Sequence, residues 1–197
     1  VSAVSSILQG LSLFVDEGTE VEAAYKKLLV TFNQFNFERL GFEPKAGEAD
    51  EDEMVRQLVI SNMIKGDDAK ASAKASEIYA AHADDISKLP AAIRLQILIN
   101  QIKHHESKEL TDLYLNTYAQ ATDGNFKRQL STALAYTTDA DTVEKILTKW
   151  KNKDVVKPQD LAMSWYFTFL HHEFTQESAW TWARENWDWV KAALGGD

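Results

Sequence analysis

Residues 19–40, TEVEAAYKKLLVTFNQFNFERL, decide the fold class of this chain of 197 residues. Apolar side chains recur in this stretch at intervals of three and four residues, at Val21, Ala24, Tyr25, Leu28, Leu29, Phe32 and Phe35. Such spacing places the side chains on one face of an α-helix. We therefore expect a long amphipathic helix over residues 19–40.

The rest of the chain has the same helical character. The three prolines and eight glycines fall between periodic segments, which is typical of helices joined by short loops. No stretch alternates apolar and polar residues as a β-strand would, so the sequence predicts an all-α protein. We expect about ten helices, over approximately residues 2–15, 19–40, 50–65, 67–82, 90–104, 107–121, 124–136, 140–151, 158–172 and 175–192.

Polar residues stand at several expected helix starts. Asp and Thr side chains can accept hydrogen bonds from the free amides of a first helical turn. We expect N-caps at Asp67, Asp123, Asp139 and Thr175.

The later helices also repeat in pairs. The pairs begin near residues 50, 90, 124 and 158, so the spacings are about 40, 34 and 34 residues. Helix pairs at this period are typical of α-solenoids. We expect stacked antiparallel helix pairs in a HEAT- or armadillo-like superhelix, with residues 1–197 forming a single helical-repeat domain.

Charge and composition limit the partners. Thirty acidic and twenty-one basic residues give a net charge of −9. Nucleic-acid-binding proteins usually carry a basic patch, so we expect no nucleic-acid partner. No apolar run approaches the ~20 residues that span a bilayer, so we expect no membrane partner. The absence of cysteine agrees with a reducing compartment.

Residues 179–192, AWTWARENWDWVKA, are the most aromatic stretch. On one continuous helix, Trp180 and Trp187 would share one stripe, and Trp182 and Trp189 a nearly opposite one. A platform that stacks on a ligand would hold its rings on one exposed face. We therefore expect both stripes to pack between neighbouring helices, with ligand stacking as the alternative.

Two histidine-rich stretches, HHESKE (104–109) and HHEFTQ (171–176), are candidates for a metal site. A zincin helix needs a second histidine four residues after the first. That position holds Glu109 in one stretch and Gln176 in the other. We expect no catalytic and no metal-ligating residue here, and we place each histidine pair at a helix end, where the helix dipole favours a cation.

The acidic run EADEDE (48–53) has two interpretations. It can place negative charge on the start of the helix over 50–65, where the helix dipole favours it. The alternative is that it attracts a cation or the amine of a peptide.

Four segments in order resemble the C-terminal helical domain of aminopeptidase N-type zinc metallopeptidases, and of the bacterial cytoplasmic enzymes in particular. The segments are RLGFEPKAGEADEDEMVRQLVISNMIKGDD (39–68), KLPAAIRLQIL (88–98), KPQDLAMSWYF (157–167) and AWTWARENWDWV (179–190). The first resembles a Leu-Gly-aromatic-x-Pro-Lys-x-Gly-Glu loop and the helix that follows it. Together the blocks cover the chain from about residue 25 to its end.

The resemblance implies a non-catalytic part of a zinc-dependent aminopeptidase. The H-E-x-x-H signature and the Gly-x-Met-Glu-Asn loop of that family are absent here, and in the family they belong to an upstream domain that holds the zinc. The chain is then a fragment truncated at both ends, without a cofactor of its own. The resemblance further implies a cytoplasmic protein whose helices cap the active-site chamber and control the access of peptides.

Three arginines are candidates for that channel. Arg56, Arg94 or Arg128 would meet the carboxylate of a peptide; the alternative for each is a salt bridge between helices. A different function is also open, namely a free-standing helical-repeat module that binds a protein or peptide. A third alternative is an independent enzyme with a site assembled across helices.

Overall fold

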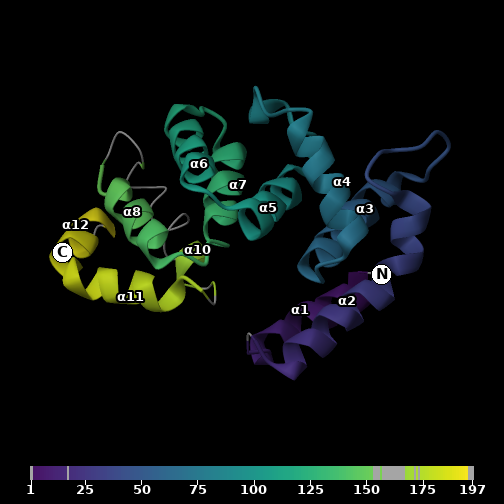
Figure 1. Cartoon of the computed structure of the whole chain (residues 1–197), viewed down its shortest axis with the longest axis horizontal. Coiled ribbons are helices and arrows are strands. Elements are labelled where there is room, and N and C mark those ends of the chain that lie inside the picture. The colour runs from purple at the N-terminus through teal and green to yellow at the C-terminus, as the bar shows by residue number, and fades with distance from the viewer. Residues whose placement is uncertain are drawn as a thin grey trace. The chain divides into compact units, whose positions relative to one another are not determined.

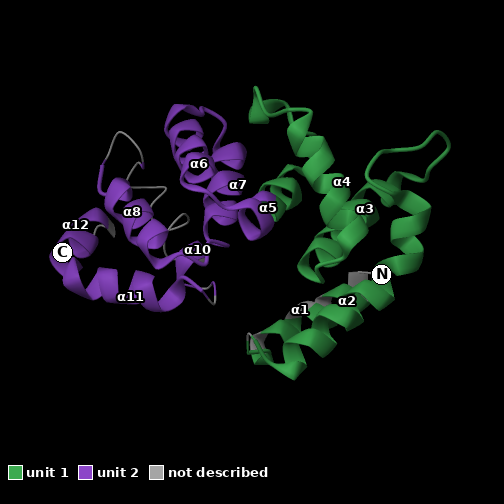
Figure 2. Ribbon diagram, in the orientation of Figure 1, with its two compact units in different colours: residues 1–100 green, residues 101–197 purple. Residues whose placement is uncertain are grey.

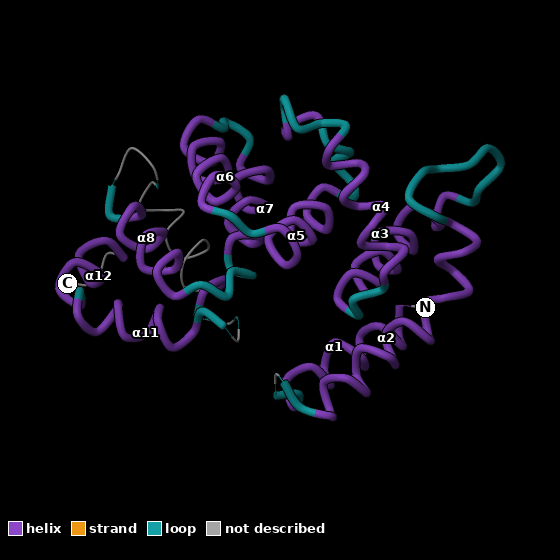
Figure 3. Tube along the Cα trace, in the orientation of Figure 1, coloured by secondary structure: helices purple, strands orange, loops and turns teal. Residues whose placement is uncertain are grey.

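The computed structural model describes residues 2–16, 18–152, 156, 167–170, 172 and 174–194 (Figure 1). The chain divides into two compact units, Val1–Asn100 and Gln101–Asp197 (Figure 2). Over the described residues it forms helices, turns and loops, and none of these residues lies in a β-strand (Figure 3). The expected all-α class is confirmed.

The observed helices follow the expected order. Unit 1 contains α1 (Ser2–Leu11), the 3-10 helix η1 (Ser12–Phe14), α2 (Glu20–Leu40), α3 (Asp50–Lys65), α4 (Ala69–Ala80) and the 3-10 helix η2 (Ile86–Lys88). α5 (Arg94–His105) begins in unit 1 and ends in unit 2. Unit 2 continues with α6 (Lys108–Gln120), α7 (Gly124–Leu134), α8 (Ala140–Trp150), α10 (Phe167–Phe169), α11 (Gln176–Glu185) and α12 (Trp187–Leu194).

Two expected helices need comment. Most of the helix expected over 158–172 falls outside the described residues, which include only 167–170 and 172 of that range. The helix expected over 175–192 is interrupted at Asn186 and forms α11 and α12. Within the described part of the chain, no helix combines the length and apolar character that a membrane span requires.

The pair α2–α3 forms the centre of unit 1. Arg39 at the end of α2 pairs with Asp52 at the start of α3. Lys65 at the end of α3 lies over the ring of Tyr25, near the start of α2, with its Nζ 5.5 Å from the ring centroid. The two helices are therefore antiparallel, as the sequence predicts for a helix pair.

Buried polar side chains fix α1 against this pair. Asn62 on α3 donates from Nδ2 to Ser5 Oγ on α1 at 3.0 Å and to Asn33 Oδ1 on α2 at 3.4 Å. The hydroxyl of Tyr25 donates to the carbonyl of Leu8 at 3.0 Å. Since buried polar groups need specific partners, these bonds define one register among the three helices.

The apolar face of α2 is only partly buried. Tyr25 and Leu29 are in the core, and Leu28 packs against them half-buried, but Val21, Phe32 and Phe35 are exposed. An amphipathic helix buries its apolar face only where another element covers it. The contacts of α2 with α1 and α3 follow Tyr25 and Leu29, so the adjacent part of its apolar face stays uncovered.

Unit 2 has an aromatic core. α6 packs on α7, and α8 packs on α11. The ring of Trp150 on α8 meets the ring of Phe169 edge-on, with centroids 4.8 Å apart, and both are fully buried. Tyr114 and Tyr118 of α6 are buried as well.

Within each unit the helices pack mainly on near neighbours in the chain. This is the packing of an α-solenoid, in which each helix pair contacts the next. The superhelical course of the whole chain stays a prediction, as does the single domain over residues 1–197.

Two of the four expected N-caps are confirmed. Asp123 accepts from the amides of Asn125 and Phe126, and Asp139 accepts from Thr142. The expectation for Asp67 is wrong by one residue: Asp67 has a positive φ of 55° and pairs with Lys26, while Asp68 caps α4.

Thr175 occupies the N-cap position of α11 but makes no cap hydrogen bond. Its hydroxyl donates instead to the carbonyl of Phe169 at 2.7 Å. Thr175 is therefore at the expected N-cap position, but the expectation that its side chain caps the helix by a hydrogen bond is wrong.

Candidate functional site

Arg56, the first channel candidate, lies on α3 with 3% of its surface exposed. Its Nη2 donates to Glu48 Oε2 and forms an ion pair with it. This bond lowers the pKa of the Glu48 carboxyl, because the guanidinium favours its charged form. Glu48 Oε1 and Arg56 Nε are buried and have no hydrogen-bond partner among the described residues. A peptide carboxylate would reach Arg56 only after Glu48 had left the pair.

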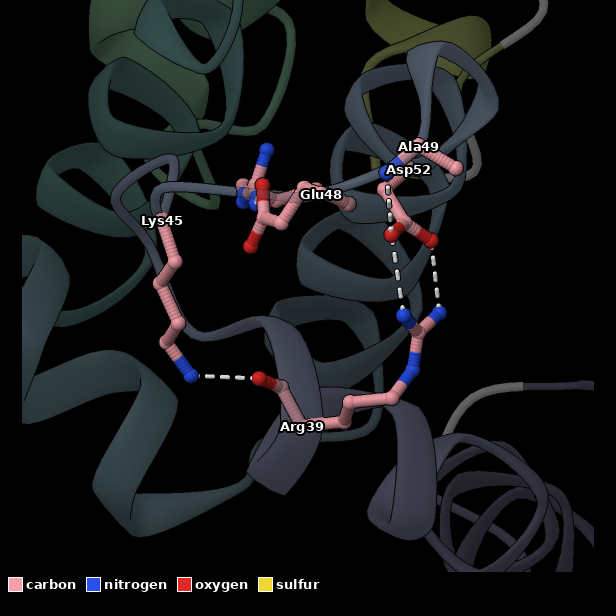
Figure 4. A network of polar contacts seen from close by, with 6 residues as sticks. Arg39, Lys45, Glu48, Ala49 and Asp52 are labelled. Carbon is pink, nitrogen blue, oxygen red and sulfur yellow. Dashed lines mark hydrogen bonds and ion pairs between the residues drawn. The ribbon is translucent and has the colours of Figure 1, made fainter.

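A second ion pair lies beside the first. Arg39 donates from Nη1 to Asp52 Oδ2 at 3.0 Å and from Nη2 to Asp52 Oδ1 at 2.8 Å (Figure 4). Asp52 also accepts from the amide of Ala49 at 3.2 Å, at the start of α3. The hydrogen bond from Arg39 lowers the pKa of Asp52. One carboxylate thus joins the end of α2 to the start of α3.

The acidic run 48–53 lies where the dipole interpretation places it. Asp50, Glu51, Asp52 and Glu53 form the first turn of α3. Negative side chains at that position stabilise a helix by opposing its dipole. Asp50, Glu51 and Glu53 are exposed, so they are the part of the run that can reach a cation or a peptide amine.

The loop between α2 and α3, residues 41–49, is held at both ends. Gly41 and Gly47 have positive φ values of 61° and 82°, which side chains disfavour. The ring of Phe42 is buried and meets the ring of Phe37 edge-on, at 5.9 Å between centroids. Lys45 Nζ donates to the carbonyl of Arg39 (Figure 4). The contacts of Phe42 and Lys45 hold the loop against the end of α2.

Arg94, the second candidate, lies at the start of α5. Its Nη2 donates to the carbonyls of Ser87 at 2.8 Å and Leu89 at 3.0 Å, and its Nε donates to Leu89 at 3.2 Å. The side chain is half-buried. These bonds tie η2 and the residue after it to the first turn of α5.

Arg128, the third candidate, is exposed on α7, and its Nη2 donates to Asn125 Oδ1 at 2.9 Å. Arg56 and Arg94 belong to unit 1, whereas Arg128 belongs to unit 2. Each of the three therefore has its own local partners.

The tryptophan stretch is half core and half surface. Trp182 is buried, and its ring meets that of Trp189 edge-on at 5.7 Å between centroids. Trp180 and Trp187 are each 52% exposed. The expectation that both stripes pack between helices is therefore wrong for the stripe of Trp180 and Trp187. Trp180 and Trp187 lie on a side of α11 and α12 that neighbouring helices leave largely uncovered. The helix is also interrupted at Asn186, whose Nδ2 donates to the carbonyl of Trp182 at 2.8 Å.

The exposed Trp180 borders a shallow open pocket. Leu170, Gln176 and Glu177 line the rest of it, and its volume is about 380 Å³. An exposed indole face beside a carboxylate can attract a cationic group. The pocket is open to solvent on a wide side, and the polar residues described in its lining, Gln176 and Glu177, are exposed.

The histidine stretches form no metal centre in the described part of the chain. His104 and His105 are the last residues of α5, which confirms the expected helix end. His171 and Glu173 of the second stretch lie outside the described residues. Among those described, no group of three or more histidine, aspartate or glutamate side chains is placed to hold a metal ion.

The whole chain matches one protein family. The profile of the family described as ERAP1-like C-terminal domain covers residues 1–197. The chain belongs to this family.

Aminopeptidases N are among the relatives. Aminopeptidase N of Lactococcus lactis subsp. lactis is 48% identical over 195 residues, which are 99% of this chain and 23% of that protein. Aminopeptidase N of Lactobacillus helveticus is 34% identical over 197 residues, 100% of this chain and 23% of that protein. Aminopeptidase M1-B of Oryza sativa subsp. japonica is 26% identical over 195 residues, 96% of this chain and 22% of that protein. The resemblance to aminopeptidase N-type enzymes is confirmed, and the chain spans less than a quarter of these relatives.

In this ERAP1-like C-terminal domain, the loop motif that carries the resemblance has a structural explanation. Its glycines provide the positive φ values, its aromatic residue is the buried Phe42, and its last residue, Glu48, pairs with Arg56. Sequence reasoning singled out Arg56 and the acidic run 48–53, but it did not predict the Glu48–Arg56 and Arg39–Asp52 pairings. The signal in the sequence is opposite charge, between residues on either side of the loop for Arg39–Asp52 and between the loop and α3 for Glu48–Arg56.

Proposed function

We propose that this chain is the non-catalytic C-terminal part of a zinc-dependent aminopeptidase that releases N-terminal residues from peptides. The observation that carries the proposal is the family match over residues 1–197, together with 48% identity to a protein named aminopeptidase N. The zinc belongs to an upstream catalytic domain of the same polypeptide, because the H-E-x-x-H signature is absent from these 197 residues. We place the protein in the cytoplasm, in agreement with a chain that has no cysteine.

In this proposal the helices cap the active-site chamber and control which peptides enter it. Stacked helix pairs offer a continuous surface of side chains, which suits the wall of a chamber. A wall of this kind orients a peptide and excludes folded proteins without taking part in bond cleavage.

Arg94 and Arg128 are the channel candidates whose side chains reach the surface. Either guanidinium would bind the carboxylate of a peptide as a charge-assisted hydrogen bond. For Arg56 the same role requires Glu48 to leave its ion pair, so we propose that this residue acts by holding the loop over 41–49.

The test of the function uses the full-length polypeptide that contains this chain. We expect it to hydrolyse aminoacyl-anilides, to lose that activity when a chelator removes zinc, and to regain it when zinc is added back. The isolated 197-residue chain is the control, and we expect it to be inactive.

Two results would contradict the proposal. One is stoichiometric zinc or hydrolysis in the isolated chain, which would favour an independent enzyme. The other is a reading frame without an upstream H-E-x-x-H sequence, which would favour a free-standing module that binds a protein or peptide.

A further inference from the structure

Asn100 on α5 is a polar side chain that is fully buried against α4. None of its surface is exposed to solvent. Its Nδ2 donates to the carbonyl of Ser72 at 3.2 Å and to Ser76 Oγ at 3.0 Å. Turning the amide over would place Oδ1 against the carbonyl oxygen of Ser72, and two acceptors cannot bond to each other. The two bonds therefore fix the position of Asn100 Oδ1.

Asn100 Oδ1 is buried and has no hydrogen-bond partner among the described residues. In the unfolded chain this oxygen is hydrogen-bonded to water, so burying it without a donor costs free energy. Most buried polar side-chain atoms in proteins have a partner, which is either a protein group or an ordered water. Oδ1 therefore requires a donor between α4 and α5.

Two more buried oxygens without a described partner lie on the same helices, Ser72 Oγ on α4 and Gln96 Oε1 on α5. Ser72 already contacts Asn100 through its carbonyl. Gln96 precedes Asn100 by four residues, so the two side chains are neighbours on one face of α5. Two amide acceptors and one hydroxyl are thus gathered where the two helices meet.

A water molecule has the hydrogen-bonding groups that these three oxygens need. It can donate to Asn100 Oδ1 and Gln96 Oε1 while it accepts from the hydroxyl of Ser72. Buried waters in proteins typically make about three hydrogen bonds to otherwise unsatisfied polar groups. A metal ion fits less well, because two neutral amides and a hydroxyl supply no negative charge. The α4 face that Asn100 contacts carries the small side chains of Ser72 and Ser76, which suits a ligand as small as water.

We propose that unit 1 binds one buried water molecule between α4 and α5, held by Ser72 Oγ, Gln96 Oε1 and Asn100 Oδ1. The water completes a polar contact that Asn100 begins with its direct bonds to α4. α4 and α5 are joined through η2 and the loop that follows it, so the bound water fixes how this helix pair closes. All three residues belong to unit 1, and the site is independent of the proposed function.

The direct test is a crystal structure of the polypeptide that contains this chain, at a resolution that places ordered waters. We expect one water oxygen within about 2.5–3.0 Å of all three protein oxygens. Two direct pairings would overturn the inference. One is a hydroxyl of Ser72 that donates to Asn100 Oδ1, and the other is an amide of Gln96 whose Nε2 donates to Asn100 Oδ1. In either case the donor of Asn100 Oδ1 is a side chain and not a water.

Ser72→Ala tests the same site through stability. Alanine has a higher helix propensity than serine, so propensity alone would raise the urea midpoint of the 197-residue chain. We expect the midpoint to fall instead, because the water loses the group from which it accepts and holds Asn100 Oδ1 less tightly. Ser87→Ala, the same substitution at an exposed serine of unit 1, is the control and should shift the midpoint less. A higher midpoint for Ser72→Ala would show that the hydroxyl has no partner and would overturn the inference.

Discussion

Both units have an apolar core, but the buried contacts that join their helices differ. In unit 1, Ser5, Asn33 and Asn62 are hydrogen-bonded across three helices. In unit 2, Trp150 and Phe169 pack their rings between helices. A buried hydrogen bond contributes modest net stability but requires one geometry, whereas a buried ring contributes mainly through the apolar area removed from water. Polar contacts thus define the register of α1 to α3 in unit 1, whereas a ring contact joins α8 to α10 in unit 2.

The largest effect should come from removing a ring in unit 2. Trp150→Ala leaves a cavity beside Phe169, and we expect it to lower the free energy of unfolding by about 3–5 kcal/mol. Urea unfolding of the 197-residue chain, followed by far-ultraviolet circular dichroism, measures this. Trp150→Phe is the control and should cost less, because it keeps an aromatic ring. A loss below about 1 kcal/mol for Trp150→Ala would contradict the comparison.

Removing the buried guanidinium of unit 1 should have the second-largest effect. Arg56→Met keeps most of the apolar volume but leaves the carboxylate of Glu48 without its partner. We expect a lower urea midpoint than in the original chain, and partial recovery when Glu48→Gln is added. If the single and double variants unfold at the same midpoint, the pair does not stabilise the loop over 41–49.

The polar bridge of unit 1 should have a smaller, more local effect. Asn62→Ala leaves Ser5 Oγ and Asn33 Oδ1 without this donor, and we expect a loss of about 1–3 kcal/mol. Amide hydrogen exchange should accelerate more in α1 than in α4, because the bridge holds α1 on the pair α2–α3. Uniform acceleration across unit 1 would show that the bridge does not act on α1 in particular.

Acid should weaken the ion pairs of unit 1. The pKa of Glu48 and that of Asp52 are lowered below 4.5 and 3.8 by hydrogen bonds from Arg56 and Arg39. The unfolded chain therefore binds more protons than the folded chain as the pH falls through these values, and stability is lost in that window. We expect the urea midpoint to be constant above the window and to fall within it.

The variant Glu48→Gln/Asp52→Asn is the matched control for the acid series. Its midpoint should fall less steeply, because two of the groups with a lowered pKa no longer titrate. Asp112 and Asp139 of unit 2, whose pKa values are also lowered, should account for part of the remaining fall. An unchanged slope in the variant would show that the two ion pairs contribute nothing to acid stability.

The sequence was sufficient to predict where the helices lie along the chain, but not which helices pack against one another. The spacing of Tyr25 and Leu29 predicted α2, because helical periodicity is a local property. The exposure of Phe32 and Phe35 could not be predicted, because it depends on which element covers that side of α2. The N-cap of α4 was misplaced from Asp68 to Asp67, since either carboxylate satisfies the local pattern.

The candidate site shows the same limit. Arg56 stood out as a basic residue inside a predicted helix, but its partner Glu48 lies within a loop whose course depends on two glycines. Whether an arginine is free for a ligand depends on such tertiary contacts, which spacing alone does not encode. The exposed Trp180 was missed for a related reason, because its exposure depends on which element covers that side of α11, and spacing does not encode this.

The smallest effect should come from the exposed indole of unit 2. Trp180→Ala removes a ring that is 52% exposed, and we expect a change in the free energy of unfolding of no more than about 0.5 kcal/mol. Trp182→Ala, on the same helix, is the control and should cost several times more, because Trp182 is buried against Trp189. Repeating both variants in the full-length polypeptide sharpens the comparison. A loss above about 1 kcal/mol for Trp180→Ala in the full-length polypeptide, but not in the 197-residue chain, would mean that another part of the polypeptide covers the indole. Equal losses for the two variants in the 197-residue chain would contradict the division of this helix into a core side and a surface side.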